Sequence, residues 1–446
     1  MAEIFLYAYF KFAYFLLLVP YKFMRNPKSG IFHVVEWMPQ KVLCGVSHVV
    51  ILFLYCVKVQ RALVDATFEN HISIFTLFEM IFSLLYKITL VKTFWVKKET
   101  IQGILNSFNT DLNLNALSSS CRNSWIESLL FCNILLGFYS VIAITRLFVS
   151  NVGVLFMTYV PSNYKTVSFS TWYFNLKYEA KCTILLQQPC VADMHFREAG
   201  QVFTLPQDGI LLTIIIFIFL SRSFMAYLSD VFVLMIILTL SEPVKKFTRP
   251  LVKELERENM GIVTTSKDSH VADWVRKITG RNDKMVLPRC MSPSINTLVE
   301  RYEALKRLSF KLNNVVGAPF LFYLGEAVIT YAIHLYDRLE LAKRSDMNPV
   351  TTVVHFLFYV TTFLIFFTSS EICRQMNFFK SWLFDKRRSL NLDMNEFFFL
   401  LDSLASKVVS ISAFDVVTMS YSMIGTFLGL ILTFFIVSLT SPQKPQ

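Results

Sequence analysis

The sequence predicts an all-α protein that crosses a membrane seven times, with its N-terminus in the cytoplasm and its C-terminus outside the cell. Three observations support this prediction. Hydrophobic residues make up 54% of the 446 residues and only 17% are charged, whereas soluble domains have about 25% charged residues. Several apolar stretches reach the roughly 20 residues that a helix needs to cross a bilayer. Lys and Arg gather in alternate connections, which sets the orientation.

Seven apolar stretches are long enough to be spans, and charges interrupt them at few positions. The first contains only Lys58 and Arg61, whose long side chains can extend to the membrane surface. The fourth covers roughly 48 Å as a helix, which exceeds the hydrocarbon thickness, so we expect its last turns to leave the membrane and to end near Pro243. The predicted spans are residues 42–63, 71–94, 125–148, 209–240, 310–336, 350–370 and 414–439.

The segments outside the spans divide the chain. Residues 4–19 are apolar and aromatic, which favours a helix lying in the inner membrane surface, with Tyr7, Tyr9, Tyr14 and Tyr21 at headgroup level. Residues 95–124 are interpreted as a polar connection. Helical patterns at 294–308, running into the fifth span, and at 394–406 predict cytoplasmic helices. The predicted regions are 1–41 (cytoplasmic or interfacial), 42–241 (spans one to four, with a long external loop 149–207), 242–309 (basic cytoplasmic loop and anchor helices), 310–370 (spans five and six), 371–413 (cytoplasmic) and 414–446 (final span and external tail).

The orientation rests on the basic residues. The side that carries the N-terminus has 29 Lys and Arg, fifteen of them between Glu242 and Lys311, and the other side has 10. Basic residues favour the cytoplasmic side, so the N-terminus is expected inside the cell. G-protein-coupled receptors have the opposite orientation, and the sequence lacks their Asp-Arg-Tyr and Asn-Pro-x-x-Tyr motifs. The net charge of +11 is explained by these loops, and no nucleic acid is expected as a partner.

The sequence contains no motif for catalysis or for a cofactor. It has no P-loop, no HExxH and no GxSxG, so an enzyme is not expected. The eight cysteines include no CxxC and no zinc-binding spacing, so no metal is expected. Cys182 and Cys190 fall together in the predicted external loop, where an oxidising environment would permit a disulfide.

Ionisable residues inside the predicted spans are expected to face protein or water, because they are costly in lipid. Glu79 with Lys87, and Asp230 with Arg222, are interpreted as intramembrane ion pairs. A pocket in the external half of the bundle would combine polar groups with aromatic walls, as small-molecule sites do. Tyr and His at helix ends alternatively anchor helices at the membrane surface. The candidate ligand-binding residues are Glu326, Tyr323, Tyr331, His334, His355 and Glu79.

The last span carries a sequence motif. Gly425 and Gly429 form GxxxG, which permits close helix approach in lipid. The run from Gly429 to Ser441 resembles the final-helix signature of the insect gustatory receptor family, which reads Gly, three residues, Thr-Tyr, five apolar residues and Gln-Phe. Gly429 and Thr433 match, Phe434 replaces the Tyr, and Thr440-Ser441 replace the Gln-Phe. The inverted seven-span plan, with its long basic loop between spans four and five, resembles the wider insect gustatory and odorant receptor superfamily.

The resemblance implies a tetrameric, ligand-gated, nonselective cation channel in the plasma membrane, opened by a small-molecule tastant. Its partners would be the tastant, membrane lipid and other receptor subunits. The final helices of four subunits would surround the pore. Thr433, Val437 and Thr440 have the i, i+4, i+7 spacing of one helix face, and Asp415 is the span's only charge, so we expect a hydrophobic gate lined with hydroxyl groups. The candidate pore residues are Thr433, Phe434, Val437, Thr440 and Ser441.

Three alternatives stay open at this point. An odorant-receptor-type subunit would require a co-receptor. A polytopic transporter commonly contains internal repeats, and none is visible in the sequence. A protein of the same architecture without a sensory role is the third.

Overall fold

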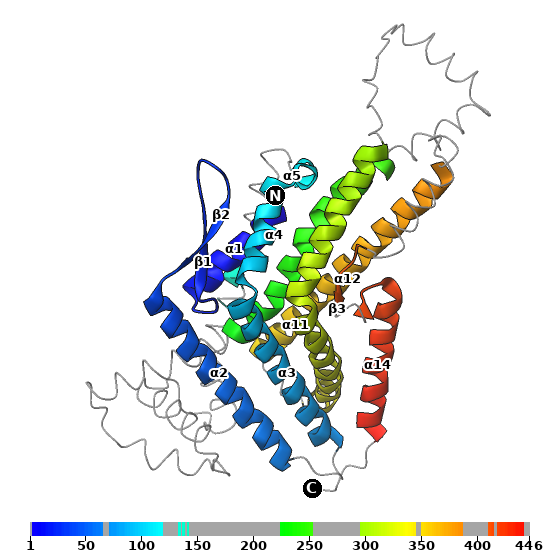
Figure 1. The fold of residues 1–446 in the computed structure, drawn as a ribbon. Helices are drawn as coiled ribbons and strands as arrows, with labels where there is room; N and C mark the ends of the chain where they lie inside the picture. Colours follow the sequence, from blue (N-terminus) through cyan, green and yellow to red (C-terminus); the bar gives the residue numbers. More distant parts are fainter. Residues whose placement is uncertain are drawn as a thin grey trace, which may run out of the picture.

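The computed structural model describes residues 2–65, 71–118, 133–134, 136–138, 141, 224–252, 295–344, 349–386, 409–413 and 417–440. Within them the protein is almost entirely helical (Figure 1). Four described helices are long and apolar enough to cross a membrane: 38–64, 74–96, 224–252 and 296–336. The third predicted span, 125–148, lies almost wholly outside the described residues, so seven spans and their orientation stay a prediction.

The N-terminal segment is packed inside the protein. It consists of helix α1 (Ala2–Phe15) and the antiparallel strands β1 (Tyr21–Arg25) and β2 (Phe32–Glu36). The predicted helix is present, but placing Tyr9 and Tyr21 at headgroup level was wrong, because each is only 1% exposed. The ring of Tyr9 lies 5.3 Å from that of Phe232, and Phe10 packs edge-on against the same ring. An aromatic-rich apolar stretch looks the same in sequence whether protein or lipid surrounds it.

The next described helices include the first two predicted spans and, after them, a helix that was not predicted from the sequence. They are α2 (Met38–Asp65), α3 (His71–Val96), α4 (Lys98–Thr110) and α5 (Leu112–Ser118). The interpretation of residues 95–124 as a polar connection was wrong for α4. Its buried residues recur at the i, i+3, i+4, i+7 spacing of one helix face; they are Ile101, Ile104, Leu105 and Phe108. This amphipathic pattern was present in the sequence, but the many Asn and Thr residues between the apolar positions made it hard to recognise.

The helix Phe224–Val252, bright green in Figure 1, continues beyond the predicted end of the fourth span. From the sequence this helix is expected to end near Pro243, and a proline inside a helix does cost about 3 kcal/mol. That expectation was wrong. The residues that follow bury their side chains on the core, where each contributes roughly 1.5–3 kcal/mol and offsets the proline. The buried side chains around this point are Leu240, Val244, Phe247 and Leu251.

Two long helices follow, α11 (Ile295–Arg344) and α12 (Pro349–Lys386). Helix α11 has 50 residues and is about 75 Å long. It contains both the predicted cytoplasmic helix and the fifth span as one continuous helix, as expected. Gly325 allows α11 to approach α3 closely, because a Cβ there would lie 2.6 Å from the Phe82 ring.

The final helix α14 (Tyr421–Thr440) begins later than the predicted start at residue 414. The residues before it form a small antiparallel hairpin of β3 (Ser412–Ala413) and β4 (Val417–Thr418). The side chains of Ser309 and Asn313 on α11 both donate hydrogen bonds to the carbonyl of Ser410, at 2.7 and 3.0 Å. Because side chains of α11 form hydrogen bonds with the backbone of this segment, its polar backbone groups do not need helical hydrogen bonds.

The helices α2, α3, α11 and α14 lie in a row, with α2 and α14 at opposite edges (Figure 1). Helices α3 and α11 form the middle of this row, and α14 packs mainly against α11. This arrangement leaves α14 with a broad side that no described helix covers.

Candidate functional site

A cluster of aromatic rings joins α11, α12 and α14. Tyr331 on α11 packs at a tilt of 34° against Tyr359 on α12, with ring centroids 4.5 Å apart, and its ring also lies 5.8 Å from that of Phe427 on α14. Phe427 in turn packs against Phe366 of α12 at 4.4 Å. Such ring pairs add about 0.5–1.5 kcal/mol beyond their buried area. We call Tyr331, Tyr359, Phe366 and Phe427 the aromatic bridge, because these four residues connect the final helix to its two neighbours.

Polar contacts lie beside the aromatic bridge. The hydroxyls of Tyr323 and Thr362 are 2.6 Å apart, which links α11 to α12. The Tyr331 hydroxyl donates to the carbonyl of Tyr359 at 3.3 Å. On the α3 side, the Thr330 hydroxyl donates to the Glu79 carboxylate at 2.9 Å. Tyrosines on α11 are therefore positioned through both their rings and their hydroxyl groups.

A buried charged layer lies deeper in the bundle, where α3, Phe224–Val252 and α11 meet. Lys87 is 2% exposed and donates a hydrogen bond of 2.7 Å to the Ser229 hydroxyl. Its ammonium also lies 4.2 Å from the centre of the Tyr86 ring. The Lys87 ammonium interacts electrostatically with the carboxylates of Glu326 and Asp230. One Glu326 oxygen is buried without a hydrogen bond among the described residues. We call Lys87, Ser229, Asp230 and Glu326 the buried charged layer.

The structure brings some of the predicted ligand-binding residues together and separates others. Tyr331 belongs to the aromatic bridge, and the ring of His334 lies 6.1 Å from that of Tyr359. Tyr323 lies near both the bridge and the charged layer. Its ring is 5.6 Å from that of Tyr86, which is next to Lys87 in sequence. It is also 6.4 Å from the ring of Phe358, which itself lies 5.5 Å from the ring of Tyr331.

The other candidates have separate positions. Glu326 belongs to the charged layer, and Glu79 accepts its hydrogen bond from Thr330. The side chain of His355 lies outside the described residues, as do Cys182 and Cys190, so their predicted roles stay predictions. Among the described residues, no group of three His, Cys, Asp or Glu side chains is arranged to hold a metal ion.

The charged layer differs from the predicted ion pairs. Glu79 was interpreted as the partner of Lys87, but eight residues of helix separate two side chains by about 12 Å along the axis. In the structure Lys87 instead donates its hydrogen bond to the Ser229 hydroxyl. Arg222, the predicted partner of Asp230, lies outside the described residues. The sequence shows which charges lie inside spans, but pairing between spans depends on which helix faces meet.

Helix α14 is apolar and largely uncovered. Phe427 and Ile431 are its buried side chains, at 6% and 4% exposure, whereas Leu432 and Ile436 are more than half exposed. A Cβ added at Gly425 or Gly429 would meet no described atom within 4 Å. The predicted GxxxG surface is therefore open within this one chain, among the residues that the structure describes.

The candidate pore residues fall on different sides of α14. Thr433 and Val437 are exposed, so they share the open side as predicted from their spacing. The Thr433 hydroxyl donates to the carbonyl of Gly429 at 2.8 Å, inside the helix. Phe434 packs edge-on against Phe75 of α3, with centroids 5.3 Å apart, and so faces the body of its own chain. Thr440 ends the helix, with its side chain outside the described residues, as is the whole of Ser441.

The base of α14 is held by a polar joint with α12. The Tyr421 hydroxyl donates to Glu371 at 3.2 Å, and Arg374 donates two hydrogen bonds to the same carboxylate, at 2.8 and 2.6 Å. These bonds, with that of Arg374 largest, lower the pKa of Glu371 to about 2, against the opposing effect of burial. Glu371 lies just beyond the predicted sixth span, so this joint is expected at the inner membrane surface.

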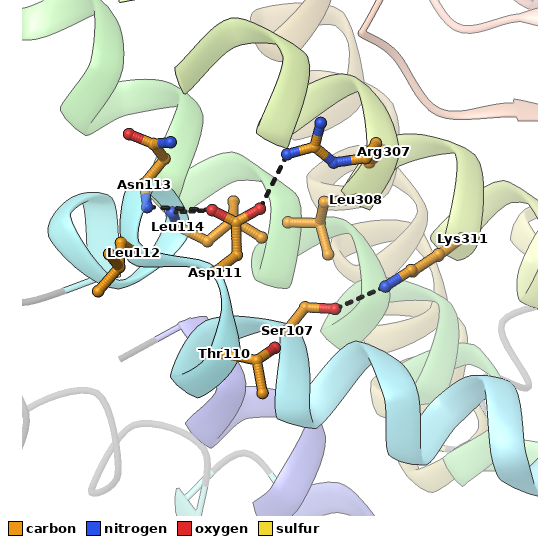
Figure 2. Close-up of a pocket in the computed structure, with 9 residues that line it drawn as sticks. All are labelled: Ser107, Thr110, Asp111, Leu112, Asn113, Leu114, Arg307, Leu308 and Lys311. Atoms are coloured by element: carbon orange, nitrogen blue, oxygen red, sulfur yellow. Dashed lines mark hydrogen bonds and ion pairs between the residues drawn. The ribbon is translucent and has the colours of Figure 1, made fainter. Parts of the chain in front are cut away.

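A cavity of about 440 Å³ lies where α4, α5 and α11 meet (Figure 2). Arg307 donates to the Asp111 carboxylate at 3.0 Å, and Lys311 donates to the Ser107 hydroxyl at 2.8 Å. Asp111 also accepts the backbone N–H of Asn113 at 3.0 Å, so it caps α5 as well. The charges in this cavity are used to fasten α4 and α5 to α11.

The fold has a counterpart among solved structures. The structure of the insect olfactory receptor OR5 from Machilis hrabei matches 97% of this chain and 97% of its own, with a TM-score of 0.50 at 14% sequence identity. The same receptor in complex with eugenol gives a TM-score of 0.49 at 12% identity, over 99% of this chain and 100% of the other. No protein-family model and no curated protein matches the sequence. The likeness to the first structure shows that this chain has the fold of that olfactory receptor.

Proposed function

We propose that the chain is a gustatory-type chemoreceptor subunit that forms a ligand-gated, nonselective cation channel in the plasma membrane. Its N-terminus would lie in the cytoplasm, its C-terminus outside the cell, and seven helices would cross the bilayer. The fold shared with an olfactory receptor supports the receptor class. The match of Gly429 and Thr433 to the final-helix signature favours the gustatory type.

The observation that carries this proposal is the open side of α14. The helix has no charged residue, buries only a narrow stripe on its own subunit and leaves its two glycines uncovered. Small residues let helices approach closely in lipid. Four subunits that meet along this side would bury it and would surround a path for ions. The proposed pore residues are Thr433, Phe434, Val437, Thr440 and Ser441, with Phe434 acting partly as a contact to α3.

The proposed ligand site lies in the outer half of the helix bundle, around α11 and its neighbours α3 and α12. Its residues are Glu326, Tyr323, Tyr331, His334, His355 and Glu79. A ligand opens a channel only if it binds the open state more tightly than the closed state. The aromatic bridge supports such a link, because a displaced Tyr331 ring loses or changes its contact with Phe427 on the pore helix. The polar joint at Glu371 would hold the base of α14 while its outer part moves.

Recording from cells that express the chain alone tests the proposal. We expect a ligand-evoked, nonselective cation current with single-channel steps. Ligand-dependent flux without such steps would instead indicate a transporter. A tag after Gln446 should be labelled on intact cells, and labelling only after permeabilisation would contradict the orientation.

An odorant-type subunit is the second candidate, because the matched structure is an olfactory receptor. Such a subunit would need a co-receptor. Current that appears only after co-expression with a second receptor subunit would favour it over the gustatory type.

A further inference from the structure

An apolar groove lies along the first turns of α2. Figure 1 shows this helix at the edge of the helix row away from α14. The volume of the groove is about 490 Å³. Val42, Val46 and Val49 are 60%, 53% and 68% exposed, so one helix face presents three branched apolar side chains outward. Gly45 leaves a gap between them, and the indole of Trp95 from α3 forms the floor of the groove.

The floor is fixed in place by hydrogen bonds. The Trp95 indole N–H donates to Nδ1 of His48 at 2.9 Å. His48 must then carry its proton on Nε2, which lies 3.1 Å from the carbonyl of Leu18 and donates to it. The one polar group of Trp95 is therefore used inside the protein, and its apolar ring is left facing the groove.

The mouth of the groove is positively charged. Lys41, which lines it, and Lys98 each contact one oxygen of Glu36 at 2.6 Å. Within this group of three, two ammonium groups on one carboxylate leave a net charge of +1. Of the charges on either side of Lys98, Glu99 also acts on Lys98 and is offset in the count by Lys97. The hydrogen bonds from Lys41 and Lys98 lower the pKa of Glu36, so the carboxylate stays charged and the three groups keep this balance at neutral pH. All three side chains remain partly exposed.

We propose that this groove binds one anionic phospholipid, with an acyl chain between the α2 valines and Trp95 and its headgroup at Lys41 and Lys98. The shape and charge match such a lipid, because the apolar walls run from a cationic mouth along the first three turns of a predicted span. The predicted orientation places the mouth at the cytoplasmic leaflet, which carries the anionic lipids. The site lies at the opposite edge of the helix row from α14 (Figure 1), so it does not depend on the proposed pore.

Native mass spectrometry of the purified full chain tests this site. The protein is mixed with equal amounts of phosphatidylserine and phosphatidylcholine that carry the same acyl chains. We expect one phosphatidylserine to be retained per chain in preference to phosphatidylcholine. Each lysine near an anionic surface changes the affinity about fivefold, so the variant Lys41→Gln/Lys98→Gln should lose most of this preference and keep weak binding of both lipids.

Filling the groove separates this site from general contact with lipid. A Cβ at Gly45 would lie 3.7 Å from the Trp95 ring, an ordinary contact, and the further carbons of a leucine would enter the groove, so Gly45→Leu should reduce retention of both lipids at least tenfold, with thermal unfolding used to check that the variant is folded. Val46→Phe fills the groove from an exposed position and serves as a second variant. Leu43→Phe is the control, because Leu43 is 50% exposed on the same helix but does not line the groove.

Three results would overturn the proposal. They are equal retention of the two lipids by the unmodified chain, retention by both groove-filling variants at the level of the Leu43→Phe control, and a chain dimer that dissociates when the groove is filled. The last result would show that a second copy of the chain, and not a lipid, occupies the groove.

Discussion

Helix Phe224–Val252 and helix α14 both carry a long, strongly apolar stretch, but the first is buried inside the protein and the second is mostly exposed. In the first, 83% of the most apolar stretch is buried inside the protein. In α14, Phe427 and Ile431 are buried while Leu428, Leu432 and Ile436 are more than half exposed. A long apolar stretch is therefore either buried at the centre of the protein or left uncovered by the described residues, and its own sequence does not distinguish the two.

Because of this difference in burial, we expect the two helices to have different roles. Phe224–Val252 contacts α1, α3 and α11 through buried side chains, the last through Phe247 and Tyr302, and contributes Ser229 to the buried charged layer. Helix α14 has one narrow stripe against its own chain, and no described residue covers the rest; in the proposed channel this surface faces lipid or other copies of the chain. Substitutions in the first helix should act on folding, and substitutions on the open side of α14 should act on conduction or assembly.

The largest expected effect comes from the charged layer. Lys87→Met removes the cation next to Asp230 and Glu326, and an uncompensated buried charge costs about 3–5 kcal/mol. We expect a large loss of folded protein in a detergent thermal-stability assay. Adding Asp230→Asn should restore part of the loss. Lys58→Met is the control at a partly exposed lysine of α2, and equal losses for Lys87→Met and Lys58→Met would contradict a buried ionic layer.

A matched isoleucine pair tests the comparison directly. Ile236 is fully buried in Phe224–Val252, and Ile436 on α14 is 56% exposed. Ile236→Ala should lower the free energy of unfolding by about 2–5 kcal/mol, whereas Ile436→Ala should stay within about 0.5 kcal/mol. Thermal unfolding of both variants in the same detergent gives the answer. Similar losses would mean that α14 is covered within its own chain.

The sequence predicted the helical class, most spans that the structure describes and the spacing that puts Thr433 and Val437 on one side of α14. It did not predict that Pro243 lies inside a helix, because that depends on the burial of Val244 and Phe247 against other segments. It also paired Lys87 with Glu79, since only neighbours on one helix are visible in a sequence. The aromatic bridge was missed apart from Tyr331, because Phe occurs 44 times in the chain and its pattern does not identify which rings meet.

The aromatic bridge is expected to give an intermediate effect. Its contacts should differ between the closed and open states if it transmits ligand binding to α14. In a double-mutant cycle, Tyr331→Ala and Phe427→Ala should couple by about 0.5–1.5 kcal/mol, which is roughly a two- to tenfold departure from additivity in the half-activating ligand concentration. Phe363→Ala is the control partner, because Phe363 is exposed on α12 at 64%. Additive effects of Tyr331→Ala and Phe427→Ala would remove the bridge from the gating route.

The smallest expected effect is at the base of α14. Glu371→Gln weakens the joint to Tyr421 and Arg374 and should cost about 0.2–1 kcal/mol, because Arg374 is largely exposed. The folded pKa of about 2 lies below the ordinary value of 4.5. The contribution of Glu371 is therefore complete above pH 4.5 and is lost as the pH falls towards 2. The difference in thermal stability between wild type and Glu371→Gln should thus be the same at pH 7 and pH 5.5, and a difference that disappears by pH 5.5 would contradict this joint.

Cysteine accessibility on the open side of α14 tests most directly whether this helix lines the ion path. Thr433→Cys would be made in a Cys56→Ser background, because Cys56 is an exposed free cysteine, and treated with a charged, membrane-impermeant thiol reagent during ligand-evoked current. We expect the reagent to block the Thr433→Cys current progressively and to leave the Ile236→Cys current unchanged. A Thr433→Cys channel that conducts normally and is never affected by the reagent would place the ion path elsewhere.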